Sequence, residues 1–468
     1  MEIGNMEQLK YNVGDAPVLP CIGIDIGTTT ISAVVLDVAK GETVGAYTVD
    51  NGSDIPSAFV WEKTQDPERI FNRVQELLES MYDRYPGVKA IGITGQMHGI
   101  LYMDADGNAV SPLYTWQDGR AGIGSPSPCQ ILEERTGYRL APGYGLATHF
   151  ANLLNGNVPE NAVKLCTVMD YIVMKLTGRT CPLTHSSNAA SLGLYDTQAN
   201  AFVTEAVLGA GIDPAVLPEV TAENVTAGTW NGIPVTAAIG DNQASFLGSV
   251  QNPDREALAN YGTGSQISVM NRDTTGFQPD GAMEIRPFLE NSWLTSGSAL
   301  CGGRAYALVE RFFRQYITAC GTESPAEQYE VMNALAMKGL ESGRYLHVHT
   351  TFCGTRNDPS LCGRVDGISE DLLTPEAFIA GTLWGMASEL YEMFLKMPHD
   401  HVEALVISGN AVRKNPAFRR MLKEVFRMNV RMPLHKEEAA FGAAMFSAMT
   451  VGCADRDVLA ACIRYSEL

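Results

Sequence analysis

The residues best suited to chemistry in this chain are one carboxylate and two glycine–threonine turns. Asp241 stands about half-way along the 468 residues, in the run Ile239-Gly240-Asp241-Asn242-Gln243. The turns Gly27-Thr28-Thr29 and Gly262-Thr263-Gly264 lie on either side of it in the sequence, and each joins two apolar segments. A carboxylate can accept a proton from a hydroxyl group, and glycine-rich turns can hold phosphate through backbone N–H groups. The pattern therefore indicates transfer of a phosphoryl group to an alcohol.

Each of these features also has a purely structural interpretation. The two turns could be ordinary β-turns, because glycine and threonine are common in turns. Asp241 could cap a helix that begins near Gln243, although a helix cap can also act as a base. Asp25, at the end of the segment before the first turn, is a candidate to hold Mg²⁺ through water. The occurrence of two such turns in one chain favours the phosphate interpretation of both.

Two further clusters combine polar and aromatic side chains in a way that suits a sugar. Gln96-Met97-His98-Gly99 follows an apolar segment, at the end of a strand where open α/β sheets bind ligands. Trp116-Gln117-Asp118-Gly119-Arg120 places an aromatic face beside amide, carboxylate and guanidinium groups. The structural alternatives are a turn histidine at 98 and an internal ion pair between Asp118 and Arg120.

Composition limits the class of protein and its partners. The chain has 45% hydrophobic residues and a formal net charge of −19, which disfavours nucleic acid and anionic membranes as partners. Its ten cysteines never form a CxxC pair, and the first ten residues lack a basic region followed by an apolar run. We therefore expect a cytoplasmic protein with reduced thiols, a small-molecule substrate and no membrane span. A homodimer is left open.

The first part of the chain predicts alternating strands and helices. Residues 21–37 read as strand, tight turn and strand, and residues 43–49 as a third strand. Asp66-Pro67 predicts the start of a helix whose apolar residues extend to Met81. Residues 88–94 predict a buried strand. This order predicts an α/β fold, and the length predicts more than one domain.

The second part repeats some of this pattern. Residues 257–271 again read as strand, Gly-Thr turn and strand, and residues 401–407 as a buried strand. Helices are predicted over residues 416–426 and over residues 436–450, where small residues predominate. We interpret this as two related halves with a boundary close to Asp241. The middle, about 125–235, reads as an insertion that contains a helix over 167–176.

Together, these motifs resemble the FGGY family of carbohydrate kinases. The resemblance covers residues 21–450, with the motifs in the expected order. They are Asp25-Ile-Gly-Thr-Thr, Gly95-Gln-Met-His-Gly, Trp116-Gln-Asp-Gly-Arg, Gly240-Asp-Asn-Gln-Ala, Gly262-Thr-Gly, Gly354-Thr-Arg with Asp358-Pro, Gly409-Asn-Ala and Glu438-Ala-Ala-Phe-Gly-Ala-Ala.

The resemblance implies an actin-like, ribonuclease-H-type fold of two domains with the catalytic cleft between them. The implied domains are an N-terminal sugar-binding domain over residues 20–240 and a C-terminal nucleotide-binding domain over residues 241–452. ATP and Mg²⁺ are the implied cofactors. Asp241 would accept the proton of the sugar hydroxyl, and Asp25 would support Mg²⁺ together with Asp241.

The resemblance also implies the binding residues. Those of the sugar pocket would be Gln96, Met97, His98, Trp116, Asp118 and Asn242. Those that contact the ATP phosphates would be Thr28, Thr29, Thr263 and Gly264. Those that hold the adenosine or approach the nucleotide would be Gly409, Asn410, Asn415 and Gly302.

Within the family, Met97-His98 is similar to the branch of sedoheptulokinases and xylulokinases, and Gln117 with Asn188 looks most like the sedoheptulokinases. The expected reaction is phosphorylation of the terminal primary hydroxyl of a ketose, with sedoheptulose first and D-xylulose second. The chain departs from the family at Gly354-Thr355-Arg356, which usually reads Gly-Glu-Arg, and at Gly409-Asn410. The rivals from other classes are a catalytically silent sugar or nucleotide sensor and a chaperone- or actin-like ATPase.

Overall fold

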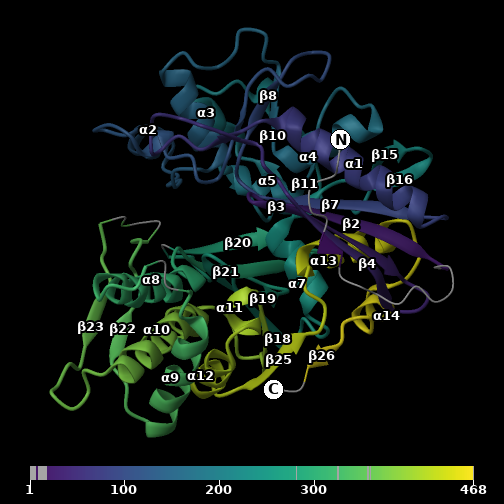
Figure 1. Cartoon of the computed structure of the whole chain (residues 1–468). Helices are drawn as coiled ribbons and strands as arrows, with labels where there is room; N and C mark the ends of the chain where they lie inside the picture. Colours follow the sequence, from purple (N-terminus) through teal and green to yellow (C-terminus); the bar gives the residue numbers. More distant parts are fainter. Residues whose placement is uncertain are drawn as a thin grey trace. The chain divides into compact units, whose positions relative to one another are not determined.

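The chain folds into two compact units. The computed structural model in Figure 1 describes residues 7–8, 18–280, 282–323, 326–355, 358 and 360–466, so most of the first ten residues and Arg356 lie outside the described ranges. Unit 1 contains the chain up to Gly248 together with Arg286–Phe288 and Glu437–Ile463. Unit 2 contains Ser249–Ile285, Leu289–Lys436 and the chain from Arg464.

Unit 1 is built on an eight-stranded mixed sheet. Its strands are β1 (Glu7–Gln8), β2 (Pro20–Ile26), β3 (Thr30–Asp37), β4 (Glu42–Asp50), β7 (Ala90–Gly95), β15 (Thr226–Trp230), β16 (Ile233–Thr236) and β17 (Ile239–Gly240). They follow the order β1-β4-β3-β2-β7-β16-β15, and β17 also pairs with β7. The β2–β3–β4 segment is antiparallel, whereas β7 runs parallel to β2, β16 and β17. The parallel strands β2, β7 and β17 therefore end at one edge.

Helices cover the two faces of this sheet in different ways. On one face, α1 (Pro67–Arg84) and α4 (Val168–Thr177) pack against the isoleucines of β2 and β7 (Figure 1). Asp66 caps α1 by accepting from the N–H groups of Glu68 and Arg69, as the Asp-Pro pair predicts. On the other face lies α13 (Glu438–Thr450). Because side chains alternate along β2, Ile24 faces α1 and α4 while Asp25 shares the face of α13.

The rest of unit 1 consists of short strands and helices. These are β5 (Asp54–Ile55), β6 (Thr64–Gln65), β8 (Leu101–Met103), β9 (Leu113–Tyr114), β10 (Lys164–Cys166), β11 (Leu183–His185), β12 (Tyr195–Asp196), β13 (Ala201–Phe202), β14 (Glu219–Thr221), α2 (Pro128–Thr136), α3 (Gly145–Leu154), α5 (Ser186–Ala189), α6 (Thr204–Gly209), α7 (Asp241–Ser249), whose last residue belongs to unit 2, and α14 (Arg456–Ala460). Most of them lie within residues 125–235, the stretch predicted to be an insertion, although β15 and most of β16, which belong to the main sheet, also fall in that stretch.

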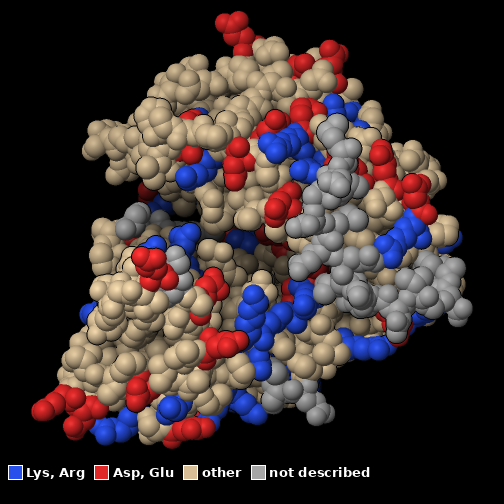
Figure 2. All heavy atoms as spheres, in the orientation of Figure 1, with Lys and Arg blue, Asp and Glu red and all other residues tan. Residues whose placement is uncertain are grey.

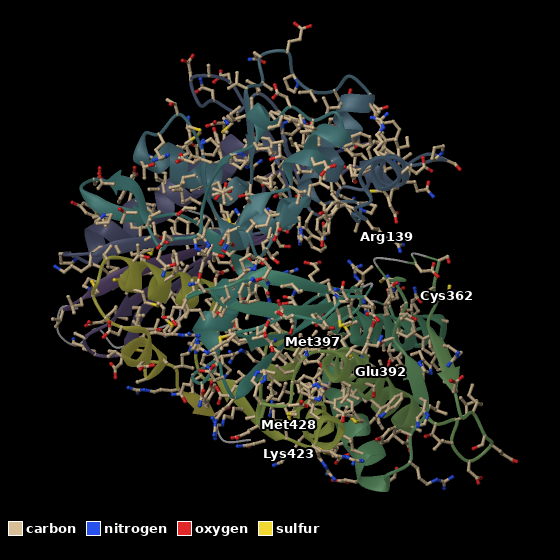
Figure 3. All side chains as sticks on the ribbon, turned by 180° about the vertical axis from the view of Figure 1, so that it is seen from behind. Arg139, Cys362, Glu392, Met397, Lys423 and Met428 are labelled. Atoms are coloured by element: carbon tan, nitrogen blue, oxygen red, sulfur yellow. The ribbon has the colours of Figure 1, made fainter. Side chains whose placement is uncertain are left out.

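Unit 2 has its own sheet, which shares one hydrophobic core with the helices of the unit. The sheet order is β20-β21-β19-β18-β24-β25-β26, and a hairpin of β22 and β23 lies apart from it. The strands are β18 (Glu256–Tyr261), β19 (Ser265–Asn271), β20 (Met283–Pro287), β21 (Trp293–Ala299), β22 (His347–His349), β23 (Arg364–Asp366), β24 (Ala404–Ser408), β25 (Asn429–Pro433) and β26 (Tyr465–Ser466). The helices are α8 (Gly303–Ala319), α9 (Tyr329–Ser342), α10 (Pro375–Lys396), α11 (Asn410–Arg413) and α12 (Pro416–Phe426). Helices α8, α9, α10 and α12 share one core with the sheet, against which Met397 and Met428 pack (Figure 3).

The two units repeat one strand pattern. In unit 1 the neighbours are β4-β3-β2-β7-β16, and in unit 2 they are β21-β19-β18-β24-β25. In both, the first three strands are antiparallel and the last three are parallel. Each Gly-Thr turn joins the corresponding hairpin, β2–β3 or β18–β19. The duplication expected from a few residues of self-similarity is therefore a duplication of topology.

The C-terminal helix α13 belongs to unit 1, whereas residues 241–452 were expected to form one domain. Its attachment depends on close backbone contact. A Cβ added to Gly23 of β2 would lie 1.9 Å from the Ala440 carbonyl oxygen, and one added to Gly92 of β7 would lie 2.0 Å from that of Ala443. The sequence indicated that this small-residue helix packs closely, but not onto which sheet.

Three further features concern the surface charges, the thiols and the lengths of the helices. Acidic and basic side chains are interspersed on the face drawn in Figure 2. All ten cysteines are free thiols. Within the described part of the chain, no helix combines the length and apolar character needed to cross a bilayer.

Candidate active site

Three predicted residues of unit 1 stand at the same edge of its sheet. Asp25 pairs in register with Thr94 of β7, and Ile239 of β17 pairs with Thr94 from the other side. Gln96 follows the last residue of β7, and Asp241 follows the last residue of β17. The carboxyl ends of parallel strands are where open α/β sheets bind ligands. Asp25 and Asp241 are more than 200 residues apart in the sequence, but only the strand β7 separates their strands in the sheet.

Asp241 is the first residue of α7, so its carboxylate lies at the positive end of the helix. The preceding strand is fixed by Thr94, whose hydroxyl donates to the Ile239 carbonyl oxygen at 2.8 Å. Gly240 N donates to Ser187 Oγ at 3.2 Å, and Gln243 Nε2 donates to the Ser187 carbonyl oxygen at 3.2 Å. Asp241 is therefore held between two anchored neighbours. It is partly exposed, whereas Asn242 is buried.

Asp25 lies in an acidic environment. Burial, followed by the charges of Asp241, Glu437 and Glu438, raises the pKa of Asp25 to about 8. A cation would relieve this repulsion, because a nearby positive charge favours the ionised carboxyl. Among the residues that the structure describes, no three His, Cys, Asp or Glu side chains form a metal cluster of their own. Mg²⁺ commonly takes one or two carboxylates and completes its shell with water and substrate phosphates. A role of Asp25 and Asp241 in holding it stays a prediction.

The first Gly-Thr turn has its carbonyl groups turned into the protein. Asn51 Nδ2 donates to the Gly27 oxygen at 2.8 Å, and Gln65 Nε2 donates to the Thr28 oxygen at 2.8 Å. Asn51 N donates to the Thr29 oxygen at 2.9 Å. In a trans peptide the N–H points opposite to the C=O of the same unit. The N–H groups of Thr28 and Thr29 are therefore directed away from Asn51 and Gln65, as an anion-binding turn requires.

A directional chain of side chains links this turn to the predicted sugar residues. Trp116 Nε1 donates to Thr28 Oγ1 at 3.0 Å, and that hydroxyl donates to Gln96 Oε1 at 3.3 Å. Gln96 Nε2 donates to Gln65 Oε1 at 2.8 Å, and Gln65 Nε2 also donates to Asp54 at 2.9 Å. The hydroxyl proton of Thr28 is thus committed to Gln96. The predicted phosphate contact of Thr28 is left to its backbone N–H.

His98 is held in an unusual backbone conformation, with φ of 71°. Its N–H donates to Ser191 Oγ at 3.1 Å, and its Nδ1 lies 2.8 Å from the Ser191 carbonyl oxygen. A carbonyl oxygen only accepts, so Nδ1 carries the proton and Nε2 is the acceptor nitrogen of the neutral ring. The ring also packs against Tyr144 at 4.6 Å between centroids. The strained turn presents an oriented imidazole.

Ser191 is connected through Asn188 to a buried polar cluster around Asp170. Ser191 Oγ donates to the Asn188 carbonyl oxygen at 2.7 Å, and Asn188 Nδ2 donates to Asp170 Oδ2 at 2.8 Å. Burial raises the pKa of Asp170 to about 7, although hydrogen bonds from Thr167, Thr184 and Asn188 oppose the rise. An aspartate in place of Asn188 would put two carboxyl groups together unless one held a proton.

Trp116 and Asp118 occupy one loop in different ways. Trp116 is 37% exposed, so one face of its indole can receive a ligand. Asp118 is fully buried and accepts from Arg120 Nε at 2.7 Å and from Lys63 N at 3.0 Å. This geometry agrees with the internal ion pair considered as the structural alternative. A sugar contact by Asp118 stays a prediction.

Met97 lies beside the backbone of the candidate base. A Cβ added to Gly240 would lie 2.4 Å from Gln243 Oε1 and 2.7 Å from Met97 Cε, so the ends of both side chains pack closely on the backbone next to Asp241. Met97 is buried. It supplies an apolar wall where the sugar pocket is predicted.

In unit 2, three predicted nucleotide segments meet at the second Gly-Thr turn. Gly303 N donates to the Gly262 oxygen at 2.8 Å, and Arg304 N donates to the Thr263 oxygen at 3.2 Å. A Cβ at Gly302 would lie 2.2 Å from the Gly264 oxygen. Gly409, with φ of 95°, follows β24, and a Cβ there would lie 2.5 Å from the Tyr261 oxygen. As in unit 1, the turn's carbonyls are bound and its amides face the other way.

The two asparagines predicted to hold adenosine differ in position. Asn410 begins α11, directly after Gly409. Asn415 is 3% exposed and caps α12, because its Oδ1 accepts from Phe418 N at 3.0 Å. The adenosine contacts of both remain predictions, and Asn415 has an evident structural duty. The motif residue Arg356 lies outside the described residues.

Sequence reasoning missed the residues that orient the predicted ones. These are Asn51, Gln65, Ser187, Ser191, Glu437 and Glu438. Their motifs carry no signal of their own, since a buried Gln or Asn next to a short strand reads as an ordinary polar residue. The acidic pair Glu437-Glu438 at the start of α13 was visible in the sequence, but its proximity to Asp25 depends on the packing of that helix.

The comparisons with known proteins agree with this geometry. Residues 21–248 match the model of the N-terminal domain of the FGGY family of carbohydrate kinases, and residues 257–451 match that of the C-terminal domain. The chain is 28% identical to a sedoheptulokinase of Mus musculus over 91% of this chain and 96% of that one. It is 25% identical to a xylulose kinase of Staphylococcus xylosus, over 92% and 90%.

Solved structures show the same fold. The xylulose kinase of Rhodospirillum rubrum has a TM-score of 0.81 at 19% identity, covering 96% of this chain and 93% of that chain. The glycerol kinase of Plasmodium falciparum, solved with ADP, has a TM-score of 0.76 at 18% identity, covering 94% and 92%. The two-unit architecture is thus that of the actin-like ATPase fold. The chain belongs to the FGGY family of carbohydrate kinases and is a sugar kinase with ATP as its co-substrate.

Proposed function

We propose that this kinase phosphorylates the terminal primary hydroxyl of a ketose, and that sedoheptulose is its substrate. The observation that carries the reaction is the common sheet edge of Asp25, Gln96 and Asp241. The choice of sugar is supported by the relatives named sedoheptulokinase, which align over nine-tenths of the chain, and by the residues Gln117 and Asn188. D-Xylulose is the second candidate, supported by the full-length xylulose kinase relative.

In this mechanism Asp241 accepts the proton of the sugar hydroxyl. At the same time the hydroxyl oxygen of the sugar forms a bond to the γ-phosphorus of ATP. The bond between that phosphorus and the oxygen shared with the β-phosphate breaks, and ADP leaves. Because the transition state of phosphoryl transfer is loose, positioning and charge stabilisation do most of the work. A carboxylate with modest basicity is therefore adequate. A side-chain base of this kind contributes about 10²–10⁴-fold in rate.

Asp25 and Asp241 are the residues that would hold Mg²⁺, which, when bound, neutralises charge on the phosphates. The backbone N–H groups of the Gly27–Thr29 turn and of the Gly262–Gly264 turn would receive the phosphate oxygens. Gly302 and Gly409 would allow the nucleotide to approach the backbone closely. Gln96, His98 and Trp116 would bind the sugar, with the second N–H of Gln96 Nε2 and the acceptor Nε2 of His98 directed to hydroxyl groups.

Replacement of Asp241 by asparagine tests the assigned base. We expect Asp241→Asn to lower kcat by about 10²–10⁴-fold, with KM for ATP and for ketose changed only a few-fold. The matched control is Asp106→Asn at an exposed position of the same unit. The measurement is ADP release coupled to a dehydrogenase. An Asp241→Asn enzyme with ordinary turnover would remove Asp241 from this role.

A substrate panel tests the sugar. Sedoheptulose, D-xylulose, D-ribulose, L-fuculose and glycerol are each supplied with ATP and Mg²⁺, and kcat/KM is compared. We expect the highest value for sedoheptulose and a lower one for D-xylulose. A higher kcat/KM for D-xylulose would make D-xylulose, and not sedoheptulose, the preferred substrate. ADP release that no sugar stimulates would favour an ATPase, and sugar binding without ADP release would favour a silent sensor.

A further inference from the structure

Two thiols of unit 2 lie in contact beside the second Gly-Thr turn. Cys301 Sγ is 3.8 Å from Cys353 Sγ. Cys301 stands between β21 and α8 and is 1% exposed, whereas Cys353 follows β22 in a turn and is half-buried. Both residues lie outside regular elements. The sulfurs need to approach by roughly 1.8 Å to reach the length of a disulfide, about 2.05 Å, and loop backbone can accommodate such a shift.

The two thiols are chemically unequal. Arg304 Nη1 lies 3.7 Å from Cys353 Sγ. Reactive cysteines typically lie in partly exposed, electropositive surroundings, and the half-buried Cys353 beside Arg304 has such surroundings. Cys301 has no such exposure, and burial, followed by the charge of Cys353, raises the pKa of its thiol to about 12. Cys353 is thus the accessible, attacking thiol, and Cys301 is its buried resolving partner.

The segment after Cys301 is bonded to the predicted phosphate turn. The Gly303 and Arg304 N–H groups donate to the Gly262 and Thr263 carbonyl oxygens. Gly302 touches the Gly264 backbone so closely that a Cβ would lie 2.2 Å from its oxygen. A displacement of Cys301 toward Cys353 would therefore move the turn directly. It would also move Arg304, whose side chain contacts Cys353 and whose N–H donates to the Thr263 carbonyl oxygen.

We propose that Cys301 and Cys353 form a reversible intrachain disulfide when the protein meets hydrogen peroxide, and that this bond weakens nucleotide binding at the Gly262–Gly264 turn. The second part rests on the proposed nucleotide site, whereas the first does not. It assigns a modification site to a chain whose ten cysteines are otherwise free thiols.

The reaction balances in two steps. The Cys353 sulfur forms a bond to one peroxide oxygen, the O–O bond breaks, and the leaving hydroxide takes a proton to become water. The Cys301 sulfur then bonds to the Cys353 sulfur, the S–OH bond breaks, and the hydroxide leaves as a second water with the Cys301 proton. Two thiols lose two electrons, and one peroxide becomes two waters. Dithiothreitol returns both thiols by exchange.

Peptide mapping tests the bond independently of any activity. The full-length protein is treated with a slight excess of hydrogen peroxide, alkylated, digested without reductant and analysed by mass spectrometry. We expect a linked pair of peptides joining Cys301 to Cys353, two hydrogens lighter than the separate peptides, and absent from Cys353→Ser. The exposed Cys362, at the outer side of unit 2 in Figure 3, provides the control variant Cys362→Ser, which should still form the bond. A Cys353–Cys362 link, or Cys353 found only as sulfinic acid, would refute the proposal.

Nucleotide binding tests the consequence. Calorimetric titration with ATP and Mg²⁺, without sugar, should show a dissociation constant raised about tenfold or more after oxidation, because the bond displaces the backbone that holds the phosphate turn; tenfold corresponds to about 1.4 kcal/mol. Dithiothreitol should restore it, and Cys353→Ser should be unaffected by peroxide. A mapped bond with unchanged ATP affinity would refute the link to the turn. Failure of the reduced protein to bind ATP at all would instead count against the proposed function.

Discussion

At the scale of single residues, Gln65 joins the two tasks assigned to unit 1. Its Nε2 donates both hydrogens, one to the Thr28 carbonyl of the phosphate turn and one to Asp54. Its Oε1 receives Gln96, a predicted sugar residue. Because each polar atom has a complementary partner, the carboxamide has one favourable orientation. That orientation in turn fixes which end of Gln96 faces Thr28 and which N–H remains for a sugar hydroxyl.

Replacement of Gln65 by methionine keeps its shape and removes this orientation. We expect Gln65→Met to lower kcat/KM for the ketose roughly tenfold to a hundredfold, since leaving buried partners unsatisfied costs about 1–3 kcal/mol each and tenfold corresponds to about 1.4 kcal/mol. A role in orientation also predicts more ADP release per sugar phosphate formed, which a purely structural role would not.

Gln75→Met is the matched control, because Gln75 is half-exposed on α1 and donates to Glu79 at the surface. The measurements are initial rates with varied ketose and the ratio of ADP to sugar phosphate. If Gln65→Met lowered stability alone and left both quantities at the control values, Gln65 would be a packing residue.

Asp170 gives unit 1 a predictable pH dependence. Burial raises the pKa of Asp170 to about 7 in the folded protein, against about 3.9 in an unfolded chain. Between these values the folded state binds more protons, so the free energy of unfolding falls as pH rises. The stabilisation is complete below about pH 4 and lost once pH passes about 7.

Asp170→Asn should mimic the protonated form, since its amide nitrogen would replace Oδ1, which has no hydrogen-bond partner in the described structure. We expect the urea midpoint of the wild type to fall from pH 5 to pH 8, and the fall to be smaller in Asp170→Asn. Asp83→Asn, at an exposed position of α1, should keep the wild-type slope. Equal slopes in all three proteins would mean that Asp170 does not titrate in this range.

At the scale of elements, the C-terminal helix α13 couples the end of the chain to the start of the site. It reaches β2 and β7 only because Gly23 and Gly92 lack side chains. At its beginning stand Glu437 and Glu438, whose charges act on Asp25. The glycines of two strands thereby set the electrostatic environment of a residue at the strand end.

Gly23→Ala should therefore affect both stability and the site. The new Cβ would lie 1.9 Å from the Ala440 oxygen and 2.4 Å from the Ala444 nitrogen, so the helix must move. Overpacking typically costs about 1–3 kcal/mol, occasionally more. We expect a lower thermal midpoint together with a higher Mg²⁺ requirement. Gly209→Ala, where the nearest atom lies at 3.5 Å, is the control. An unchanged midpoint in Gly23→Ala would contradict the close packing.

Most of the elements near the site were predictable, because each carries a local signal. Asp66-Pro67 marks the start of α1, and Asn415-Pro416 marks that of α12, where the predicted and observed bounds coincide. The two-residue strands β5 and β6 were not predicted, since they have no periodicity to detect. Gln65, whose side chain binds the Thr28 carbonyl oxygen of the phosphate turn, lies in β6. Because β6 was not predicted, the contacts that Gln65 makes were not predicted either.

At the scale of the whole molecule, the sheets of the two units share one strand topology but carry different side chains at their Gly-Thr turns. Both Gly-Thr turns join an antiparallel hairpin that is followed by a parallel strand, and both have bound carbonyls. The sequence revealed the turns, because glycine and threonine are needed there. It could not reveal which strand supplies each neighbour, because pairing between residues far apart in the chain leaves no local pattern. The copies have diverged, with Asn51 and Gln65 binding the first turn and the N-terminal amides of the α8 segment binding the second.

Because the two turns have different neighbours, we expect that ketose binding and ATP binding can be weakened separately by substitutions in different units. Gln96→Ala in unit 1 should weaken ketose binding in the absence of nucleotide and leave ATP binding unchanged. Thr263→Ala in unit 2 removes an exposed hydroxyl at the phosphate turn and should weaken ATP binding several-fold, since one hydrogen bond contributes about 0.5–1.5 kcal/mol, while ketose binding is unchanged. Thr275→Ala, also exposed in unit 2, is the control for the second variant. Calorimetry with each ligand alone measures all three. Loss of ketose affinity in Thr263→Ala equal to that in Gln96→Ala would contradict this prediction, because ketose binding would then depend on a turn of unit 2.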